Sequence, residues 1–242
     1  MLCYNAEQTI QSFLNRICNL KFEHNIDFLI LDDCSKDNTS KIIEKFISGN
    51  HSLNFSYQKN EENLGFGGNL KKAYDLAINK NYKSLSILHG DGQYPPEFLD
   101  KMYSYLSKSN LVLGSRMIVK KNAIAGKMPI IRFLGNIFLS NFQNLFFNTK
   151  LSEWHTGFRG IDIEALKKIP YHLNSNYFDI DTQILIQFII RGHNVSEFAI
   201  PTYYDQEKSG VNVIKYGLSV VFEMFLAKLT TLKLIKIKRY QI

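Results

Sequence analysis

Cysteine is scarce in this chain: among its 242 residues there are only Cys3, Cys18 and Cys34. They form no C-x-x-C pair, and no histidine stands at the spacing of a zinc-binding motif, which argues against a zinc site. A sparse, odd set of cysteines is typical of proteins from a reducing compartment. We therefore expect all three to be small buried side chains.

Long apolar runs are missing as well. No stretch reaches the roughly 18 uninterrupted apolar residues that a membrane-spanning helix needs. The first residues also lack the basic region and apolar run of a signal peptide. We expect a cytoplasmic chain that does not span a membrane.

The chain has no G-x-G-x-x-G run after its first predicted strand, which argues against a dinucleotide-binding oxidoreductase. Hydrophobic residues make up 45% and charged residues 21%, as in an ordinary folded protein. The net charge of +7 suits an anionic partner: nucleic acid, an anionic lipid surface or a phosphorylated substrate. Because the aromatic residues stand mostly in apolar helical patterns, we expect no nucleic-acid partner.

Helical and strand patterns alternate through the first two-fifths of the chain. Apolar residues spaced i, i+3, i+4, i+7 from Ile10 predict a helix that begins near residue 6, with Asn5 and Gln8 as a variant capping box. Only residues 1–4 remain for a strand before it, which is short. Further strands are expected at residues 28–31, 54–57, 84–88, 111–113 and 195–200. This alternation predicts an α/β fold with a mainly parallel sheet flanked by helices.

Polar residues follow two of the predicted strands, where parallel sheets bind their ligands. Asp33 comes directly after the first buried strand and can accept hydrogen bonds from ribose hydroxyls or a base N–H. Asp91 and Gln93 lie on the loop after residues 84–88 and offer a carboxylate and an amide oxygen two residues apart. Mg²⁺ and Mn²⁺ prefer such oxygen ligands and share them with substrate phosphates, so this loop is a predicted metal site.

Two neighbouring segments have both a functional and a structural interpretation. The glycine-rich run Asn63–Gly68 precedes a helix, so its backbone N–H groups can face a phosphate, although a tight turn also needs glycine. Ser35 and Thr39 are more readily interpreted as helix-capping residues than as ligand contacts.

Four cations are candidates for phosphate binding, because arginine forks match phosphate oxygens and lysine adds a point charge. They are Arg116, Arg132, Arg159 and Lys208. A single cation is more often a surface charge. Arg159 is favoured because it ends a motif-like His-Thr-Gly-Phe-Arg run.

Several motifs now stand in a fixed order along nearly the whole chain: residues 3–5, 32–39, 63–68, 90–97, 114–116, 155–159, 178–179 and 200–202. In this order they resemble glycosyltransferase family 2, whose members have the GT-A fold. The nearest subgroup is that of the polyprenyl-phosphate, or dolichol-phosphate, sugar synthases.

The resemblance implies an inverting enzyme that takes its sugar from a nucleotide-sugar (UDP- or GDP-) and uses Mg²⁺ or Mn²⁺. It implies a donor site built from Leu2, Tyr4, Asp33, Asn63, Gly65, His89, Gly90 and Asp91. It implies catalytic roles for Asp91, Arg116 and Arg132, and a metal held by Asp91 and Gln93. Arg159 and Lys208 are then the expected acceptor-binding residues.

The chain departs from the family pattern at three positions. The usual proline of the first motif is Leu2, the usual glutamate is Ala6, and the first acid of the D-x-D motif is His89. A neutral imidazole can still ligate a metal or contact a diphosphate. These departures leave a catalytically impaired nucleotide-sugar binder as one alternative.

The acceptor is the least determined part of the prediction. Downstream of Arg159 there is no ED-x-x-x-R or Q-x-x-R-W type run of the kind that processive polysaccharide synthases carry. A lipid phosphate is already ionised and needs little help from a general base, so polyprenyl phosphate is the favoured acceptor. A saccharide hydroxyl in cell-envelope polysaccharide synthesis is the alternative.

Two segments favour a peripheral position at the inner face of the cell membrane. Residues 128–147 are very apolar yet interrupted by polar side chains, which is typical of an interfacial helix, although a core or dimer helix fits too. Residues 226–242 carry only basic charges and are attracted to anionic headgroups. We expect a catalytic domain over residues 1–213, a basic amphipathic helical extension over residues 214–242, and leave a homodimer open.

Overall fold

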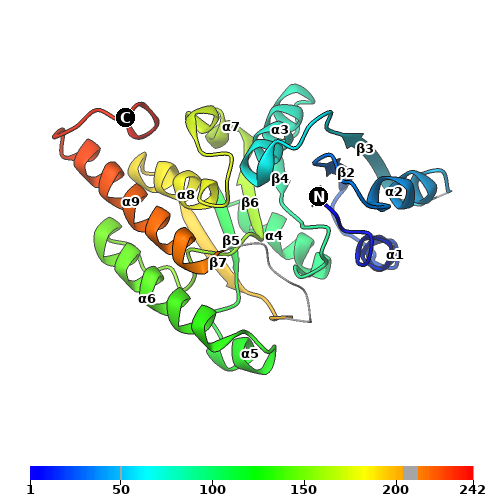
Figure 1. Ribbon diagram of the computed structural model, residues 1–242, viewed down its shortest axis with the longest axis horizontal. Helices are drawn as coiled ribbons and strands as arrows, with labels where there is room; N and C mark the ends of the chain where they lie inside the picture. The colour runs from blue at the N-terminus through cyan, green and yellow to red at the C-terminus, as the bar shows by residue number, and fades with distance from the viewer. Residues whose placement is uncertain (50, 204–211, 242) are drawn as a thin grey trace.

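The computed structural model describes residues 1–49, 51–203 and 212–241. Its strands are β1 (Leu2–Cys3), β2 (Asp27–Asp32), β3 (Asn54–Lys59), β4 (Ser84–Ser86), β5 (Leu111–Ser115), β6 (Arg159–Asp162) and β7 (Val195–Ala199). Its helices are α1 (Ile10–Cys18), α2 (Thr39–Ile47), α3 (Gly65–Asn79), α4 (Leu99–Leu106), α5 (Lys120–Ala125), α6 (Ile130–Phe147), α7 (Ile163–Leu166), α8 (Ile180–Ile190) and α9 (Val213–Thr231). Figure 1 shows how these elements succeed one another.

The strands form a three-stranded sheet in the order β1-β2-β3 and a four-stranded sheet in the order β4-β6-β5-β7. Leu2 joins the two, because its N–H donates to the Leu88 carbonyl and its carbonyl accepts from the Gly90 N–H, both at 2.9 Å. β1 pairs with β2, β2 with β3, and β5 with β7, all in parallel. The predicted α/β class is confirmed, and a two-residue first strand is enough to connect the sheet.

β6 is the strand that the sequence analysis missed. It lies antiparallel between β4 and β5, so the sheet is mixed at this place. The strand has only four residues, Arg-Gly-Ile-Asp, and therefore shows no alternation of apolar and polar positions by which it could be found.

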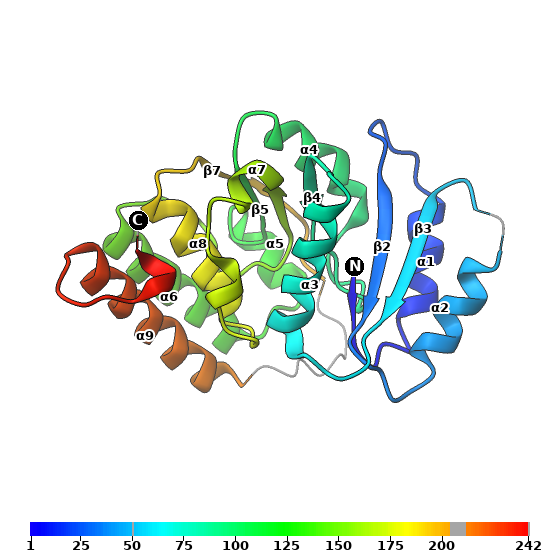
Figure 2. The same cartoon turned by 90° about the horizontal axis from the view of Figure 1, so that it is seen from above.

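The sheet is covered on both faces, and alternate residues of its strands enter different cores. From β5, Leu111 and Leu113 pack into the core beneath α3 and α8, while Val112 packs into the core beneath α1 and α4. From β2, Leu31 packs into the core beneath α3 and α8, while Ile30 packs on the other face against α1 and α2. Figure 2 shows α1 and α2 on one side of β2 and β3 and α3 on the other. This period of two is what pleated strands buried on both faces require.

α1 begins at Ile10, so the predicted start near residue 6 and its capping box are wrong. Residues 5–7 form a loop whose backbone N–H groups donate to the side chains of Ser35, Thr39 and Asp37 at 2.9, 2.7 and 3.1 Å. The interpretation of Ser35 and Thr39 as helix-capping residues is corrected too: they satisfy backbone donors of a loop that comes thirty residues earlier.

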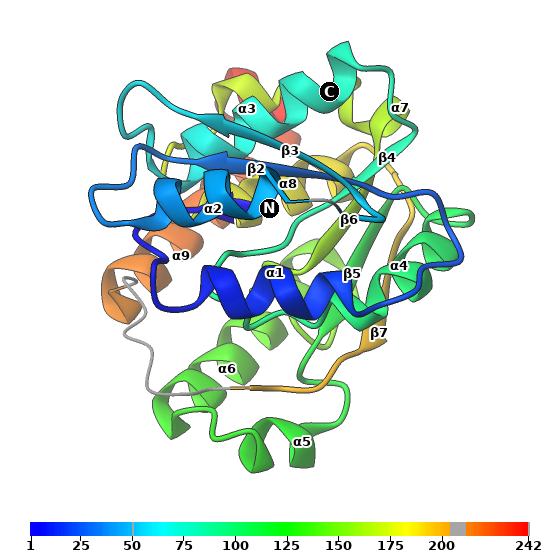
Figure 3. The ribbon, with the colours of Figure 1, turned by 90° about the vertical axis from the view of Figure 1, so that its right-hand side faces the viewer.

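α9 packs into the main core rather than away from it. Val220, Met224 and Ala227 belong to the same buried cluster as residues of the sheet. α9 lies beside α8 and α6, and α5 and α6 lie away from β2 and β3, as Figure 3 also shows. None of the helices in the described ranges is both long and apolar enough to cross a membrane.

Candidate active site

A cleft of about 1540 Å³ opens where the chain leaves β1, β2, β4 and β5. It brings together residues from loops that are more than one hundred positions apart in the sequence. Of the residues predicted for the site, those that line it are Leu2, Tyr4, Asp33, Asn63, Gly65, His89, Gly90, Asp91, Gln93, Arg116 and Arg132. The polar residues that follow the predicted strands therefore line one cleft, and their roles in binding and catalysis stay predictions.

Asp33 forms the floor of one end of the cleft and organises the glycine-rich loop. Its side chain is 3% exposed, and Oδ1 accepts hydrogen bonds from the Asn60 amide and the Leu64 N–H, both at 2.9 Å. Gly65 has φ +75° and lies where only a residue without Cβ avoids the Asn176 carbonyl. Tyr4, 47% exposed, stands at the same end with its ring available to a planar ligand.

His89 and Asp91 occupy the loop after β4. Asp91 Oδ1 accepts from the Gln93 N–H at 3.0 Å, which closes a tight turn. The His89 ring packs edge-on against Phe66 and Tyr94, and its buried Nε2 makes no hydrogen bond. Burial lowers the pKa of His89, although the nearby Asp91 opposes this, so the ring is neutral near pH 7.

This loop fits a hard divalent cation only as part of a shared site. The described residues hold no group of three or more His, Cys, Asp and Glu side chains that could enclose a metal. Asp91 supplies a carboxylate at the cleft wall, and the orphaned Nε2 of His89 is a second polar atom beside it. Such a partial set suits Mg²⁺ or Mn²⁺, which take their remaining ligands from substrate phosphates and water.

Arg116 is held at the cleft by a carboxylate that the sequence analysis did not identify. Glu153 is fully buried and accepts from Arg116 Nε at 3.0 Å, from Nη2, and from the Arg116 backbone N–H at 2.7 Å. Asn136 of α6 donates to the same carboxylate at 2.9 Å. The guanidinium also lies over the Tyr94 ring, 5.9 Å from its centroid. Arg116 is therefore oriented before any ligand binds.

One predicted acceptor-binding residue, Arg159, does not line the cleft. Arg159 is 1% exposed, and its guanidinium donates to the carbonyls of Thr156, Asp181 and Trp154 at 2.8, 2.6 and 3.0 Å. These bonds join the 154–159 loop to α8, so the structure gives Arg159 a structural role and corrects the expectation of acceptor binding. Lys208 lies outside the described residues.

Asp181, His155 and Tyr216 are among the cleft residues that were not predicted from the sequence. Asp181, in the first turn of α8, lines the cleft 3.6 Å from Arg159 Nε. Burial raises the pKa of its carboxyl, partly opposed by Arg159 and His89. His155 Nδ1 lies 2.9 Å from the Tyr216 hydroxyl of α9, and burial lowers the pKa of His155 to about 4. His155 begins the motif of residues 155–159, of which only Arg159 was assigned a role. Asp181 lies two residues after the motif of residues 178–179.

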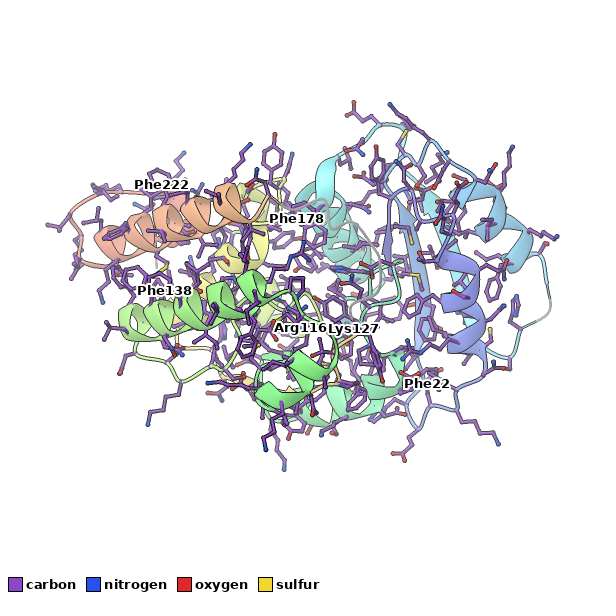
Figure 4. The ribbon with its side chains drawn as sticks, turned by 60° about the horizontal axis from the view of Figure 1, so that its bottom comes forward. Phe22, Arg116, Lys127, Phe138, Phe178 and Phe222 are labelled. Atoms are coloured by element: carbon purple, nitrogen blue, oxygen red, sulfur yellow. The ribbon has the colours of Figure 1, made fainter. Side chains whose placement is uncertain are left out.

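α6 and α9 close one side of the cleft. Arg132, Gly135 and Leu139 line it from α6, and Val213 and Tyr216 line it from α9. Figure 4 shows Arg116 and Phe178 near the same ends of these two helices, with Phe138 and Phe222 farther along them.

Comparison with known proteins identifies the family of this chain. The sequence profile of "Glycosyl transferase family 2" matches residues 1–169. The chain belongs to glycosyltransferase family 2.

Similar proteins differ in what they act on. The UDP-N-acetylglucosamine–dolichyl-phosphate N-acetylglucosaminyltransferase of Methanococcus voltae is 28% identical over 245 residues, covering 93% of both chains. The poly-β-1,6-N-acetyl-D-glucosamine synthase of Staphylococcus aureus is 28% identical over 136 residues, covering 55% of this chain and 31% of the synthase.

Solved structures show the fold. Glucosyl-3-phosphoglycerate synthase of Mycobacterium tuberculosis, in complex with Mn²⁺, UDP and phosphoglyceric acid, superposes with a TM-score of 0.61 at 15% identity. The match covers 98% of this chain and 78% of that one. The predicted GT-A fold is confirmed, and this family 2 chain has the architecture of a sugar transferase.

Proposed function

We propose that the chain transfers a sugar from a nucleotide-sugar, UDP- or GDP-linked, to a polyprenyl phosphate at the cytoplasmic face of a membrane. The observation that carries the proposal is the composition of the cleft: Asp33 and Asp91 line it from the loops after β2 and β4, whereas Arg116 and Arg132 line it from the loop after β5 and from α6. The carboxylates suit a nucleoside with a cation on its diphosphate, and the arginines suit a second phosphate-bearing substrate. The similarity to the dolichyl-phosphate enzyme over 93% of both chains supports it.

The donor site is assigned by hydrogen-bonding chemistry. Asp33 would accept hydrogen bonds from ribose or base, and Tyr4 would stack on the base. Leu2, Asn63, Gly65 and Gly90 would shape the walls around the nucleotide. A divalent cation at Asp91 and Gln93 would neutralise the charge that grows on the diphosphate leaving group.

The acceptor end is assigned by charge. Arg132 would meet the phosphate of the lipid, with Arg116 between donor and acceptor phosphates. An oxygen of the lipid phosphate would attack the anomeric carbon as its bond to the diphosphate breaks, so the configuration inverts. The nucleophile is already an anion, and the arginines align it without a general base.

One observation favours a second candidate, in which the acceptor is a saccharide hydroxyl. A hydroxyl nucleophile needs a base, and Asp181 is a carboxyl at the cleft wall whose pKa is raised by burial. The lipid-phosphate reaction does not use it.

Transfer from a panel of labelled UDP- and GDP-sugars to undecaprenyl phosphate in detergent, with and without Mn²⁺, tests the proposal. We expect metal-dependent label in the organic phase, lost in Asp91→Asn and weakened in Arg132→Gln. Lys41→Gln, at an exposed cation of α2 outside the cleft, is the matched control.

Asp181→Asn separates the two candidates. The lipid-phosphate reaction should persist in this variant, whereas transfer to a saccharide hydroxyl should stop. If no donor labels the organic phase while a saccharide acceptor releases nucleoside diphosphate, the second candidate replaces the first. Tight nucleotide binding without any transfer would instead identify an impaired binder.

A further inference from the structure

α6 turns mostly polar side chains towards the protein interior and apolar side chains towards the surroundings, which is the reverse of a surface helix in a water-soluble protein. The side chains that it buries are mostly polar: Phe133, Asn136, Ser140 and Gln143. The side chains that it exposes most are apolar and recur along one stripe: Ile130, Ile131, Leu134, Phe138 and Leu145, with exposures of 63%, 71%, 58%, 68% and 80%. Polar neighbours explain the inward face, because Asn136 and Ser140 bond to Glu153 and the Trp154 N–H.

α9 carries a second outward apolar stripe. Its exposed apolar residues are Val213, Ile214, Leu218, Phe222 and Phe225. An aromatic row joins this stripe to that of α6: Phe138 stacks with Phe142, Phe142 contacts Phe146, and Phe146 meets Phe225 edge to face. The two stripes therefore form one surface, which we call the α6–α9 face. Contiguous apolar surface of this kind marks a contact with a protein or a membrane.

The charged residues in the segments that carry the α6–α9 face are almost all cations. The cations in residues 116–152 and 212–241 are Arg116, Lys120, Lys121, Lys127, Arg132, Lys150, Lys215, Lys228, Lys233, Lys236, Lys238 and Arg239. The only acid in these two ranges is Glu223, which is buried and paired with Arg239. Segments that carry an apolar surface together with almost only cations match the boundary between anionic headgroups and acyl chains.

We propose that the α6–α9 face docks on an anionic lipid bilayer. Both helices have their N-terminal ends at the cleft, where Arg132 and Tyr216 line it. Docking would therefore set that side of the cleft against the headgroups, where a lipid phosphate is presented. The physiological role rests on the proposed lipid-phosphate acceptor, whereas the binding itself does not.

A second copy of the chain is a poorer occupant. Pairing two α6–α9 faces would bring the cation-rich segments of one copy against those of the other, so cations would face cations. No exposed acid in these ranges is available to compensate them, so the pairing would be repulsive at low salt. A bilayer with anionic lipids both buries the aromatic row and neutralises the cations.

Vesicle co-sedimentation of the full chain tests the proposal without any sugar donor. We expect binding to vesicles of phosphatidylglycerol mixed with phosphatidylcholine, little binding to phosphatidylcholine alone, and a decrease with salt. Phe138→Gln/Phe222→Gln should weaken the binding about tenfold, and Lys120→Glu/Lys121→Glu should weaken it as well. The matched controls are Leu173→Gln, an exposed apolar residue on another surface, and Lys41→Glu/Lys45→Glu on α2.

The outcomes separate docking from catalysis. If the wild type ignores anionic vesicles, or if Phe138→Gln/Phe222→Gln binds them as the wild type does, the proposal is overturned. It is also overturned if the chain is a dimer by light scattering that these substitutions dissociate. Phe138→Gln/Phe222→Gln should not affect sugar transfer to a short-chain polyprenyl phosphate in free solution. Vesicle binding without such transfer would leave the docking surface standing and remove the proposed acceptor.

Discussion

At the residue scale, the cleft depends on buried carboxylates that position other groups. Asp33 holds the glycine-rich loop, and Glu153 holds Arg116 and Asn136. Asp33 was predictable because it follows an apolar strand. Glu153 was not, since nothing in its local sequence shows that it is fully buried beside an arginine 37 positions away.

Glu153→Ala should destabilise the fold and disorder the cleft. Removing one partner of a buried ion pair leaves the other charge uncompensated, so we expect the free energy of unfolding to fall by about 3–5 kcal/mol. Urea denaturation measures this. Glu164→Ala breaks the exposed pair with Lys167 and should leave stability nearly unchanged, because solvent screens this pair. Equal effects of the two substitutions would contradict the assigned role of Glu153.

His155 should make stability depend on pH. Its pKa is about 4 in the folded chain, against an ordinary histidine value of 6.5, so the unfolded state binds a proton more readily between these pH values. The free energy of unfolding should therefore fall as the pH drops from about 6.5 to about 4, by up to ~3 kcal/mol from this group. His89, whose pKa is also lowered, contributes with the same sign.

His155→Gln should flatten this dependence without abolishing it. Denaturation midpoints measured across the same pH range give the slope. His172→Gln, at an exposed histidine, is the control and should keep the wild-type slope. An unchanged slope in His155→Gln would show that His155 is not buried in its neutral form.

At the element scale, the glycine-rich start of α3 is needed for packing against residues 175–176. The Gly67 N–H donates to the Asn176 carbonyl at 2.8 Å, and a Cβ on Gly67 would lie 2.4 Å from the Ser175 carbonyl oxygen. From the sequence alone, residues 63–68 fit a phosphate-binding loop and a tight turn equally well. The close approach of a segment more than one hundred residues away explains why glycine is needed here.

Two glycine-to-alanine substitutions in helices should have opposite effects. Gly67→Ala should lower the free energy of unfolding by about 1–3 kcal/mol, because the new methyl group overlaps a backbone carbonyl. Gly135→Ala in α6, where nothing lies within 4 Å of the added Cβ, should raise it by about 0.5–1 kcal/mol through helix propensity. Denaturant midpoints of the two variants decide this; a stable Gly67→Ala would mean that α3 does not pack on residues 175–176.

At the scale of the whole molecule, the segment from residue 214 onward behaves as part of one core. The Tyr240 ring is fully buried, and its hydroxyl donates to Glu223 at 2.5 Å, while Arg239 pairs with the same carboxylate. These contacts fold the chain back from the end of α9 towards α8. One cation of the basic segment, Arg239, is therefore neutralised by an ion pair within the chain.

A chain that ends at residue 213 should not fold cooperatively. It loses Val220, Met224 and Tyr240 from the core, each worth about 1.5–3 kcal/mol, against a total stability of about 5–15 kcal/mol. Circular dichroism during heating measures this. Leu234→Gln, at an exposed position of the same segment, should melt like the wild type. A cooperative transition in the shortened chain would establish the separate extension that the sequence suggested.

The amino-acid sequence by itself determined the family, the α/β class and the strand-end residues that line the cleft, because these follow from local apolar spacing and from motifs placed directly after strands. Only the tertiary structure decided that Arg159 is buried and bonds the 154–159 loop to α8, that Asp181 and His155 line the cleft, and that α6 turns its apolar side outward. Each of these depends on neighbours that are distant in sequence. A side chain's spacing shows which residues share a face, whereas the elements packed around it decide whether that face meets the core or the surroundings.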